Sequence, residues 1–162
     1  MKNHTSPNFD RQTLLIYLRS QRLMSLTSGV GNNLWSCSVY YVVDDKLNLY
    51  FISEPETQHI KNIHKNNKIA CNISDSSQAV VDKKVGMQIQ GIITEESNQI
   101  KIKTILSMWN KNNPGFADIV NLKNMIRKVI KSKVYKVQPI LIKFFNEKLY
   151  GSEGFRIINL NI

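Results

Sequence analysis

The fold is decided by the stretch LWSCSVYYVVDDKLNLYFIS, which spans residues 34–53. Its first half alternates with a period of two, which is typical of a β-strand with two different faces. One face carries Ser36, Ser38, Tyr40 and Val42, and the other carries Cys37, Val39, Tyr41 and Val43. The segment 44–46 is short enough for a tight connection, so residues 47–53 are predicted to return antiparallel.

The face that begins at Ser36 has an unusual composition. A strand that faces only solvent seldom carries a tyrosine, and a strand that faces only a core seldom carries two serines. Ser36, Ser38 and Tyr40 occur together here. We therefore interpret this face as a half-buried surface that binds a ligand.

A helix start is predicted directly after the hairpin. Ser53 and Glu56 have the spacing of a capping box, and Pro55 suits a first helical turn. Thr57 and His59 then place a hydroxyl and an imidazole close to the amide groups of this helix start. Such a position suits an anion, most simply a phosphate. The alternative, that both are ordinary exposed helix residues, stays open at this point.

The rest of the chain adds short strands and a few helices. A first helix is expected from about residue 10, and helical stripes of apolar residues occur at 102–109 and 122–130. Further strands are expected at 23–27, 68–73, 85–91, 134–145 and 155–160. Pro139 makes its strand an edge or a bulged strand, and Gly91 indicates a bulge or a close backbone approach. This order predicts a mainly β (α+β) fold, a small antiparallel barrel with peripheral helices, in one domain over residues 1–162.

Composition narrows the function classes. The 162 residues include 42% hydrophobic and 21% charged residues, as in ordinary globular domains. No apolar run is long enough to span a membrane, and residues 1–10 lack an apolar signal core, so we expect a cytoplasmic protein. The two cysteines, Cys37 and Cys71, fall within predicted strands and are expected to be reduced thiols.

The net charge of +10 raises the question of a nucleic-acid partner. The basic residues are spread along the chain, with only modest concentrations at 61–68 and 127–136. A nucleic-acid partner is therefore not expected, and the charge favours small anionic ligands. The three histidines do not form a metal-binding pattern with acidic residues, so no metal is expected. No catalytic triad or phosphate-loop motif occurs either, and no catalytic residue is assigned.

Four segments in order resemble one known family. They are SVYYVVDD at 38–45, LYFIS at 49–53, ETQHIKNI at 56–63 and GMQIQG at 86–91. Together they resemble the FMN-binding split-barrel family that includes pyridoxamine 5'-phosphate oxidase, and most closely its small bacterial branch. The resemblance covers roughly residues 23–95. It implies a six-stranded antiparallel split β-barrel that forms a homodimer, with FMN at the subunit interface.

The resemblance also implies site residues. Ser38, Val39 and Tyr40 would lie along the flavin ring and ribityl chain, and Ile52 and Ser53 would line the next strand. Thr57, Gln58 and His59 fall where the family places its phosphate-binding groups. Many relatives carry Arg or Lys at the positions of Gln58 and His59, and here Glu54 and Glu56 bring negative charge close by. A weaker phosphate site than is usual in the family is therefore expected.

Three alternative functions are consistent with the sequence and with the resemblance. The first is an FMN-dependent oxidoreductase that acts on a small molecule. The second is a flavin-binding protein without turnover, used for storage or sensing. The third, from a different class, is a basic barrel that binds nucleic acid. A flavin carries its own hydride chemistry, which is why an oxidoreductase of this kind needs no recognisable protein nucleophile.

Overall fold

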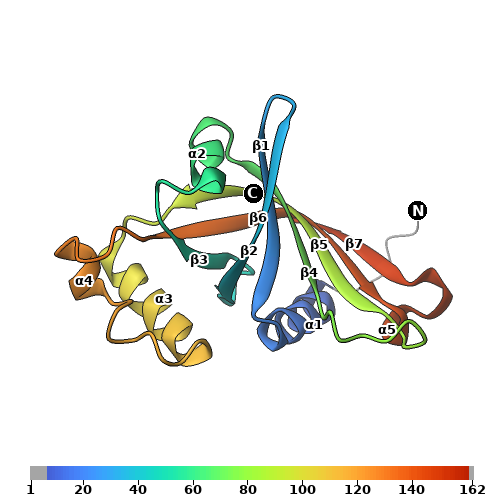
Figure 1. The fold of residues 1–162 in the computed structure, drawn as a ribbon. Helices are drawn as coiled ribbons and strands as arrows, with labels where there is room; N and C mark the ends of the chain where they lie inside the picture. Colours follow the sequence, from blue (N-terminus) through green and yellow to red (C-terminus); the bar gives the residue numbers. More distant parts are fainter. Residues whose placement is uncertain (1–6, 161–162) are drawn as a thin grey trace.

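A computed structural model describes residues 7–160 and shows a closed antiparallel barrel (Figure 1). The six barrel strands are β1 (Leu23–Val30), β2 (Asn33–Val43), β3 (Leu49–Ser53), β4 (Lys68–Ser74), β5 (Val85–Glu95) and β6 (Lys133–Asn146). They run in the order β3-β2-β1-β4-β5-β6, and pairing of β3 with β6 closes the barrel. A further strand, β7 (Phe155–Asn159), pairs with the second half of β6. The predicted fold class and the predicted strands are confirmed.

The barrel interior is filled by alternate residues of each strand. In β4, for example, Ile69, Cys71 and Ile73 are buried and the residues between them are exposed. Large side chains such as Phe51 and Phe144 meet in the same core cluster. Each such side chain contributes roughly 1.5–3 kcal/mol when it leaves water, so this alternation is the main source of stability.

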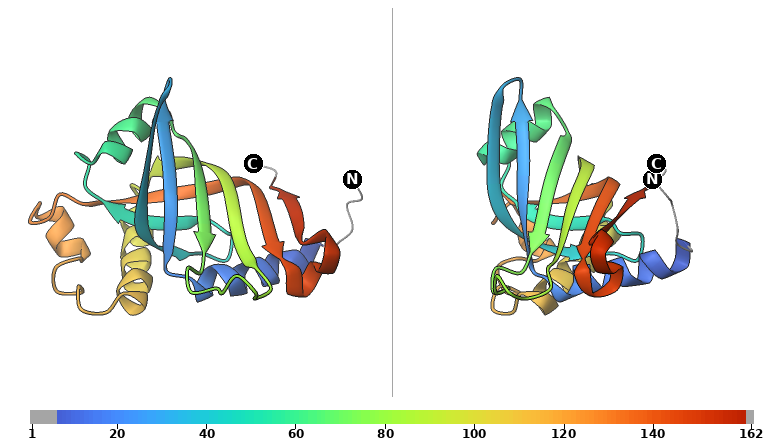
Figure 2. Two further views of the ribbon diagram at one scale, coloured as in Figure 1. Left: turned by 45° about the vertical axis from the view of Figure 1, so that its right-hand side comes forward. Right: turned by 90° about the vertical axis from the view of Figure 1, so that its right-hand side faces the viewer.

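Helices cover the outside and the ends of the barrel. The first helix, α1 (Pro7–Ser20), begins slightly before the expected position and adds Leu14, Leu15 and Leu18 to the barrel core. Figure 2 shows α1 crossing one end of the barrel, whereas α2 (Gln58–Lys65) lies towards the other end. Among residues 7–160, no helix is both long and apolar enough to cross a membrane.

Two further helices form a second, smaller core on the outside of the barrel. The helix α3 (Gln99–Asn112) packs Ile105 and Leu106 against Val42 and Tyr50. The following helix, α4 (Leu122–Ile126), ends much earlier than the predicted stripe 122–130. Lys128 takes a positive φ of 56°, which interrupts the helix and leaves Val129 67% exposed. The chain then continues through α5 (Glu147–Tyr150) and a 3-10 turn (Gly151–Glu153) to β7.

The bulge predicted at Pro139 is present. Gln90 pairs with Leu141 and Gly91 pairs with Pro139, so the residue between Pro139 and Leu141 has no counterpart in β5. A Cβ at Gly91 would lie only 2.7 Å from the carbonyl oxygen of Gln138. The close backbone approach predicted for Gly91 is therefore confirmed, because only glycine fits without a shift of β6.

The turn between β2 and β3 is organised by one carboxylate. Asp44 accepts hydrogen bonds from the backbone amides of Lys46 and Asn48, from the Asn48 side chain and from the Tyr50 hydroxyl, at 2.9–3.0 Å. Leu47 has a positive φ of 68° in this turn, and β3 begins only at Leu49. The predicted tight antiparallel return is correct, and its first two residues belong to the turn.

Candidate functional site

The barrel is split between β2 and β3. Their pairing covers only Tyr41–Val43 and Leu49–Phe51, so it ends at the Tyr41–Phe51 pair. The earlier part of β2 pairs with β1, whereas Ile52 and Ser53 continue along β6. The helix α2 follows β3 after a short turn and packs against β1 and β2. The residues predicted to bind a flavin thus lie on the two strands that diverge here and at the start of the adjoining helix.

Three side chains meet at the start of α2. The Ser53 hydroxyl oxygen lies 2.8 Å from Nε2 of His59 and 3.2 Å from the Thr57 hydroxyl oxygen. The Thr57 hydroxyl is also 3.2 Å from Nε2 of His59, and it donates to the Glu54 carbonyl at 2.8 Å. Ser53, Thr57 and His59 are therefore brought together, and we call them the Ser53 cluster.

His59 is enclosed rather than exposed. Its side chain is only 8% exposed, and its ring lies near that of Phe51, with 6.3 Å between ring centroids. Burial lowers the pKa of His59, so the imidazole is neutral near neutral pH. The alternative that His59 is an ordinary exposed helix residue is therefore wrong, whereas Thr57 is half-buried.

The predicted capping box does not form. Helix α2 begins at Gln58 with Thr57 as its N-cap, and no side chain caps it. The physical reason is that Ser53 is still the last residue of β3, where it pairs with Lys133, and its hydroxyl bonds within the Ser53 cluster. The Thr57 side chain therefore caps none of the backbone amides at the start of α2. These amides can donate hydrogen bonds to an anion.

Gln58 and Asn62 anchor α2 to the barrel. The Gln58 side-chain amide donates to the side-chain oxygen Oδ1 of Asn62 at 2.9 Å, and the side-chain nitrogen Nδ2 of Asn62 lies 3.4 Å from the hydroxyl of Ser28 on β1. Ser28 and Asn62 are both buried. Gln58 itself is exposed, and its side-chain nitrogen is used in this chain of bonds, so its role in the structure is to hold the helix start in place.

The predicted flavin-lining residues of β2 divide between the two faces of the strand. Ser38 is exposed and Tyr40 is 50% exposed on the outer face, where a ligand can reach them. Val39 is buried in the barrel core, so only its backbone is available outside. Ile52 lies half-buried on the outer face of β3 and packs against the smaller core that α3 and α4 form outside the barrel. The predicted residues therefore border the split from both strands.

One cation near the Ser53 cluster is not apparent from the sequence. Lys133 lies directly opposite Ser53 in the β3–β6 pairing. Phe51 lies two residues before Ser53, Tyr135 lies two residues after Lys133, and their rings stack with 5.4 Å between the ring centroids. Because side chains two residues apart on a strand point to the same side of the sheet, the side chains of Ser53 and Lys133 also lie on one side. Lys133 is held by Glu95 of β5, with Nζ 2.8 Å from a carboxylate oxygen. Only the long-range strand pairing brings this lysine to the site.

Tyr135 adds an unusual polar group beside Lys133. Its side chain is 1% exposed, and its hydroxyl has no hydrogen-bond partner in the described structure. Burial, and secondarily the charge of Glu95, raises the pKa of Tyr135 to about 12, so the hydroxyl keeps its proton. An unsatisfied buried hydroxyl costs roughly 1–3 kcal/mol, which a water or a ligand atom would offset.

Lys61, a basic residue on α2, is paired with a carboxylate. Its Nζ lies 3.1 Å from the Glu56 carboxylate on the exposed side of α2. Lys133 is also paired, but it lies directly opposite Ser53, so it is the better candidate to compensate for the neutral Gln58 and His59. Within residues 7–160, no group of three or more His, Cys, Asp or Glu side chains is arranged to hold a metal ion.

No protein-family model matches the chain. A UPF0306 protein from Yersinia enterocolitica is 32% identical over 80 residues, which is 49% of this chain and 54% of that protein. The chain thus spans about half the length of the curated relatives that it matches.

Several solved structures share the fold. A general stress protein 26-related protein of the pyridoxinephosphate oxidase family, from Clostridium acetobutylicum, has a TM-score of 0.65 at 9% identity and covers 96% of this chain and 97% of that one. An FAD-binding protein from Mesorhizobium loti has a TM-score of 0.60 at 13% identity, with 86% and 92% coverage. A heme binding protein from Mycobacterium smegmatis has a TM-score of 0.72 at 9% identity, with 96% and 60% coverage. The chain therefore has the split-barrel fold of the pyridoxamine 5'-phosphate oxidase-like proteins, and the resemblance seen in the sequence is confirmed at the level of the fold.

Proposed function

We propose that this protein binds FMN at the split between β2 and β3 and is an FMN-dependent oxidoreductase acting on a small molecule. The observation that carries the proposal is the Ser53 cluster at the uncapped start of α2, with Lys133 opposite Ser53. Hydroxyl groups, helix amides and one ammonium group are the donors that a phosphate monoester requires. The FAD-binding fold neighbour supports a flavin as the ligand class.

The two parts of FMN would meet different surfaces. The phosphate would lie against the start of α2, close to Ser53, Thr57 and Lys133. The ring system would lie on the outer face of β2, where Ser38 and Tyr40 are exposed beside β1. Bound FMN supplies hydride acceptance and donation, and the protein's task is to orient it and to exclude water.

The Ser53 cluster must change its hydrogen bonds to receive a phosphate. In the ligand-free arrangement the Thr57 hydroxyl donates to the Glu54 carbonyl, and the Ser53 hydroxyl is shared between Thr57 and His59. The neutral His59 ring carries one proton, so its Nε2 either donates to Ser53 or accepts from it. With the Nε2 proton present, His59 satisfies the Ser53 oxygen and frees the Ser53 proton for the phosphate.

We also propose a homodimer that uses one outer face of the barrel. Strand register places small or uncharged side chains side by side across β2, β1, β4 and β5. They are Ser25, Thr27, Ser36, Ser38, Ala70, Asn72, Gln88 and Gln90. Lys68 and Lys143 lie only at the margins of this face, so in a chain with a net charge of +10 it is where a second copy approaches with little repulsion.

The dimer proposal has a direct test. Ser25→Arg places a cation on this face, and light scattering should then show a monomer where the parent is a dimer. Gln12→Arg, on the exposed side of α1, is the matched control and should leave the mass unchanged. A parent chain that is monomeric at micromolar concentration would contradict the proposal. Cys37 and Cys71 are free thiols, which fits the cytoplasm as the proposed location.

The visible absorbance spectrum of the freshly purified protein tests flavin binding. An oxidised-flavin spectrum with FMN released on denaturation is expected, and a colourless protein that takes up no added flavin would refute the proposal. A heme spectrum would instead assign the site to the ligand class of the Mycobacterium smegmatis neighbour. Anaerobic addition of NADH or NADPH should bleach the flavin of an oxidoreductase, whereas a storage or sensing protein would keep its colour.

A further inference from the structure

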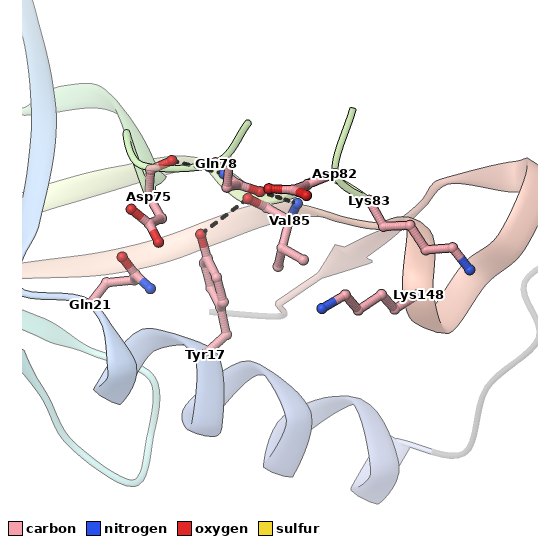
Figure 3. Close-up of a pocket in the computed structure, with 8 residues that line it drawn as sticks. All are labelled: Tyr17, Gln21, Asp75, Gln78, Asp82, Lys83, Val85 and Lys148. Carbon is pink, nitrogen blue, oxygen red and sulfur yellow. Dashed lines mark hydrogen bonds between the residues drawn. The ribbon is translucent and has the colours of Figure 1, made fainter. Parts of the chain in front are cut away.

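A cleft lies at the end of the barrel that α1 crosses. It has a volume of about 490 Å³ and is lined by residues of α1, of the loop that joins β4 to β5, and of α5 (Figure 3). This volume falls within the range of about 300–1,000 Å³ that is typical of small-molecule sites. None of the residues that line this cleft belongs to the candidate flavin site.

One end of this cleft is cationic. The ammonium group of Lys148, from α5, points towards Tyr17 and Val85, whereas the Lys83 side chain, from the loop, points outward, away from the other lining residues (Figure 3). Neither ammonium group has an ion-pair or hydrogen-bond partner among residues 7–160, although other lysines of the protein are paired. The unpaired ammonium group of Lys148, which points into the cleft, favours a carboxylate or another anion beside it.

The opposite end of the cleft is acidic. Asp75 lies there beside the amide of Gln21, with the carboxylate of Asp82 above the middle of the cleft (Figure 3). One oxygen of Asp75 accepts from the amide and the hydroxyl of Ser77, which lowers the pKa of Asp75 and keeps it ionised. One oxygen of Asp82 accepts from the amide of Ala79. The second oxygen of each carboxylate remains available to an ammonium group.

The surface between the two ends is an aromatic ring held in place. The Tyr17 hydroxyl lies 3.2 Å from the carbonyl oxygen of Ile73 and 3.4 Å from that of Val85. Burial, and secondarily the charge of Asp75, raises the pKa of Tyr17 to about 12, so the hydroxyl remains a neutral donor. Gln78 bonds to the backbone of Asp75 and Val85 and fixes the loop to the strand ends. The ring and Val85 offer an apolar middle section to a ligand.

We infer that this cleft binds a small zwitterion of dipeptide size. Its ammonium group would lie at Asp75, its carboxylate at Lys148, and its central part against Tyr17. A single-charge ligand would leave one end of the cleft unmatched. The Tyr17 ring lies between Asp75 and Lys148 (Figure 3), so the fitting class is a dipeptide or an ω-amino acid, whose two charges stand further apart than those of a free α-amino acid.

The unmodified chain can be tested with three peptides. Calorimetric titration with glycyl-leucine should show saturable binding, and N-acetyl-glycyl-leucine and glycyl-leucine amide should each bind at least about 10-fold more weakly, because each lacks one charge. An acetylated or amidated peptide that binds as tightly as the free one would overturn the proposal. So would the absence of glycyl-leucine binding at concentrations up to roughly 10 mM.

Variants then assign the two ends. Lys148→Met and Asp75→Asn should each weaken glycyl-leucine binding about 10-fold, and each should remove the difference between the free peptide and the peptide blocked at that end. Asn keeps an acceptor for Ser77, so the loop is preserved. Lys131→Met and Asp118→Asn, both exposed residues outside the cleft, are the matched controls. Equal binding by all four variants would contradict the assignment of the ends.

Discussion

Ser53 and Lys133 lie directly opposite each other in the β3–β6 pairing, and Glu95 holds the lysine by an ion pair with 2.8 Å between Nζ and a carboxylate oxygen. A phosphate at the Ser53 cluster would compete with Glu95 for this ammonium group. Lys133→Met should therefore lower FMN affinity by about 10-fold, whereas Glu95→Gln should raise it, because the lysine is released. Flavin fluorescence titration measures both changes.

The matched control for Lys133 is Lys61, which is paired with Glu56 on the exposed side of α2. Lys61→Met should leave FMN affinity nearly unchanged. Riboflavin, which lacks the phosphate, should bind equally to all of these variants. An equal loss of FMN affinity in Lys61→Met and Lys133→Met would show that only the general positive charge of the protein matters.

His59 should make the stability of the fold depend on pH. Burial lowers its pKa, so the unfolded chain takes up this proton more readily than the folded chain. The free energy of unfolding should therefore decrease as the pH falls through the ordinary histidine pKa of about 6.5. Urea unfolding of the parent and of His59→Gln between about pH 8 and pH 5.5 checks this, and the variant should show the shallower dependence. Parallel curves for the two proteins would mean that His59 protonates equally in both states.

The turn between β2 and β3 offers a comparison of two adjacent aspartates. Asp44→Ala removes four hydrogen bonds to the turn and to Tyr50, and should lower the free energy of unfolding by about 2–3 kcal/mol. Asp45→Ala removes an exposed ion pair with Arg19, and should cost less than about 1 kcal/mol. Chemical denaturation would measure both changes, and equal costs would rule out the central role of Asp44 in this turn.

Two strand glycines test the close approach at the bulge. Gly91→Ala places a Cβ 2.7 Å from the Gln138 carbonyl oxygen, so the β5–β6 pairing must shift, and a loss of about 1–3 kcal/mol is expected. Gly86→Ala is the control, because its nearest contact, the Ile73 carbonyl oxygen, lies at 3.6 Å, an ordinary contact distance. Thermal denaturation should show a clear drop in Tm for Gly91→Ala alone. Similar melting temperatures for both variants would contradict the close approach of the Gln138 carbonyl oxygen to Gly91.

Much of the barrel follows from local pattern. The alternation in residues 34–43 predicts which side chains face the core, and Cys37, Val39, Tyr41 and Val43 do so. Val42 is the exception, since it lies on the same side of the strand as Ser36 and Ser38 but is buried by α3. The period of a strand specifies two faces, and it does not specify which neighbouring helix covers part of one face.

The candidate site could be predicted only in part. The order of strand, turn and helix places Ser53, Thr57 and His59 in one short segment, and the structure brings their side chains together. The capping-box interpretation failed because β3 extends to Ser53 in its pairing with β6. The same long-range pairing supplies Lys133 and the buried Tyr135 hydroxyl, which no local pattern around the helix start can indicate.

We expect the phosphate of a bound flavin to lie at the start of α2. The most direct measurement is a parallel fluorescence titration of the full chain with FMN and with riboflavin at low ionic strength. FMN should bind at least about 10-fold more tightly, because the Ser53 cluster, the α2 amides and Lys133 would contact only the phosphate. Equal affinities for the two flavins would contradict the phosphate site.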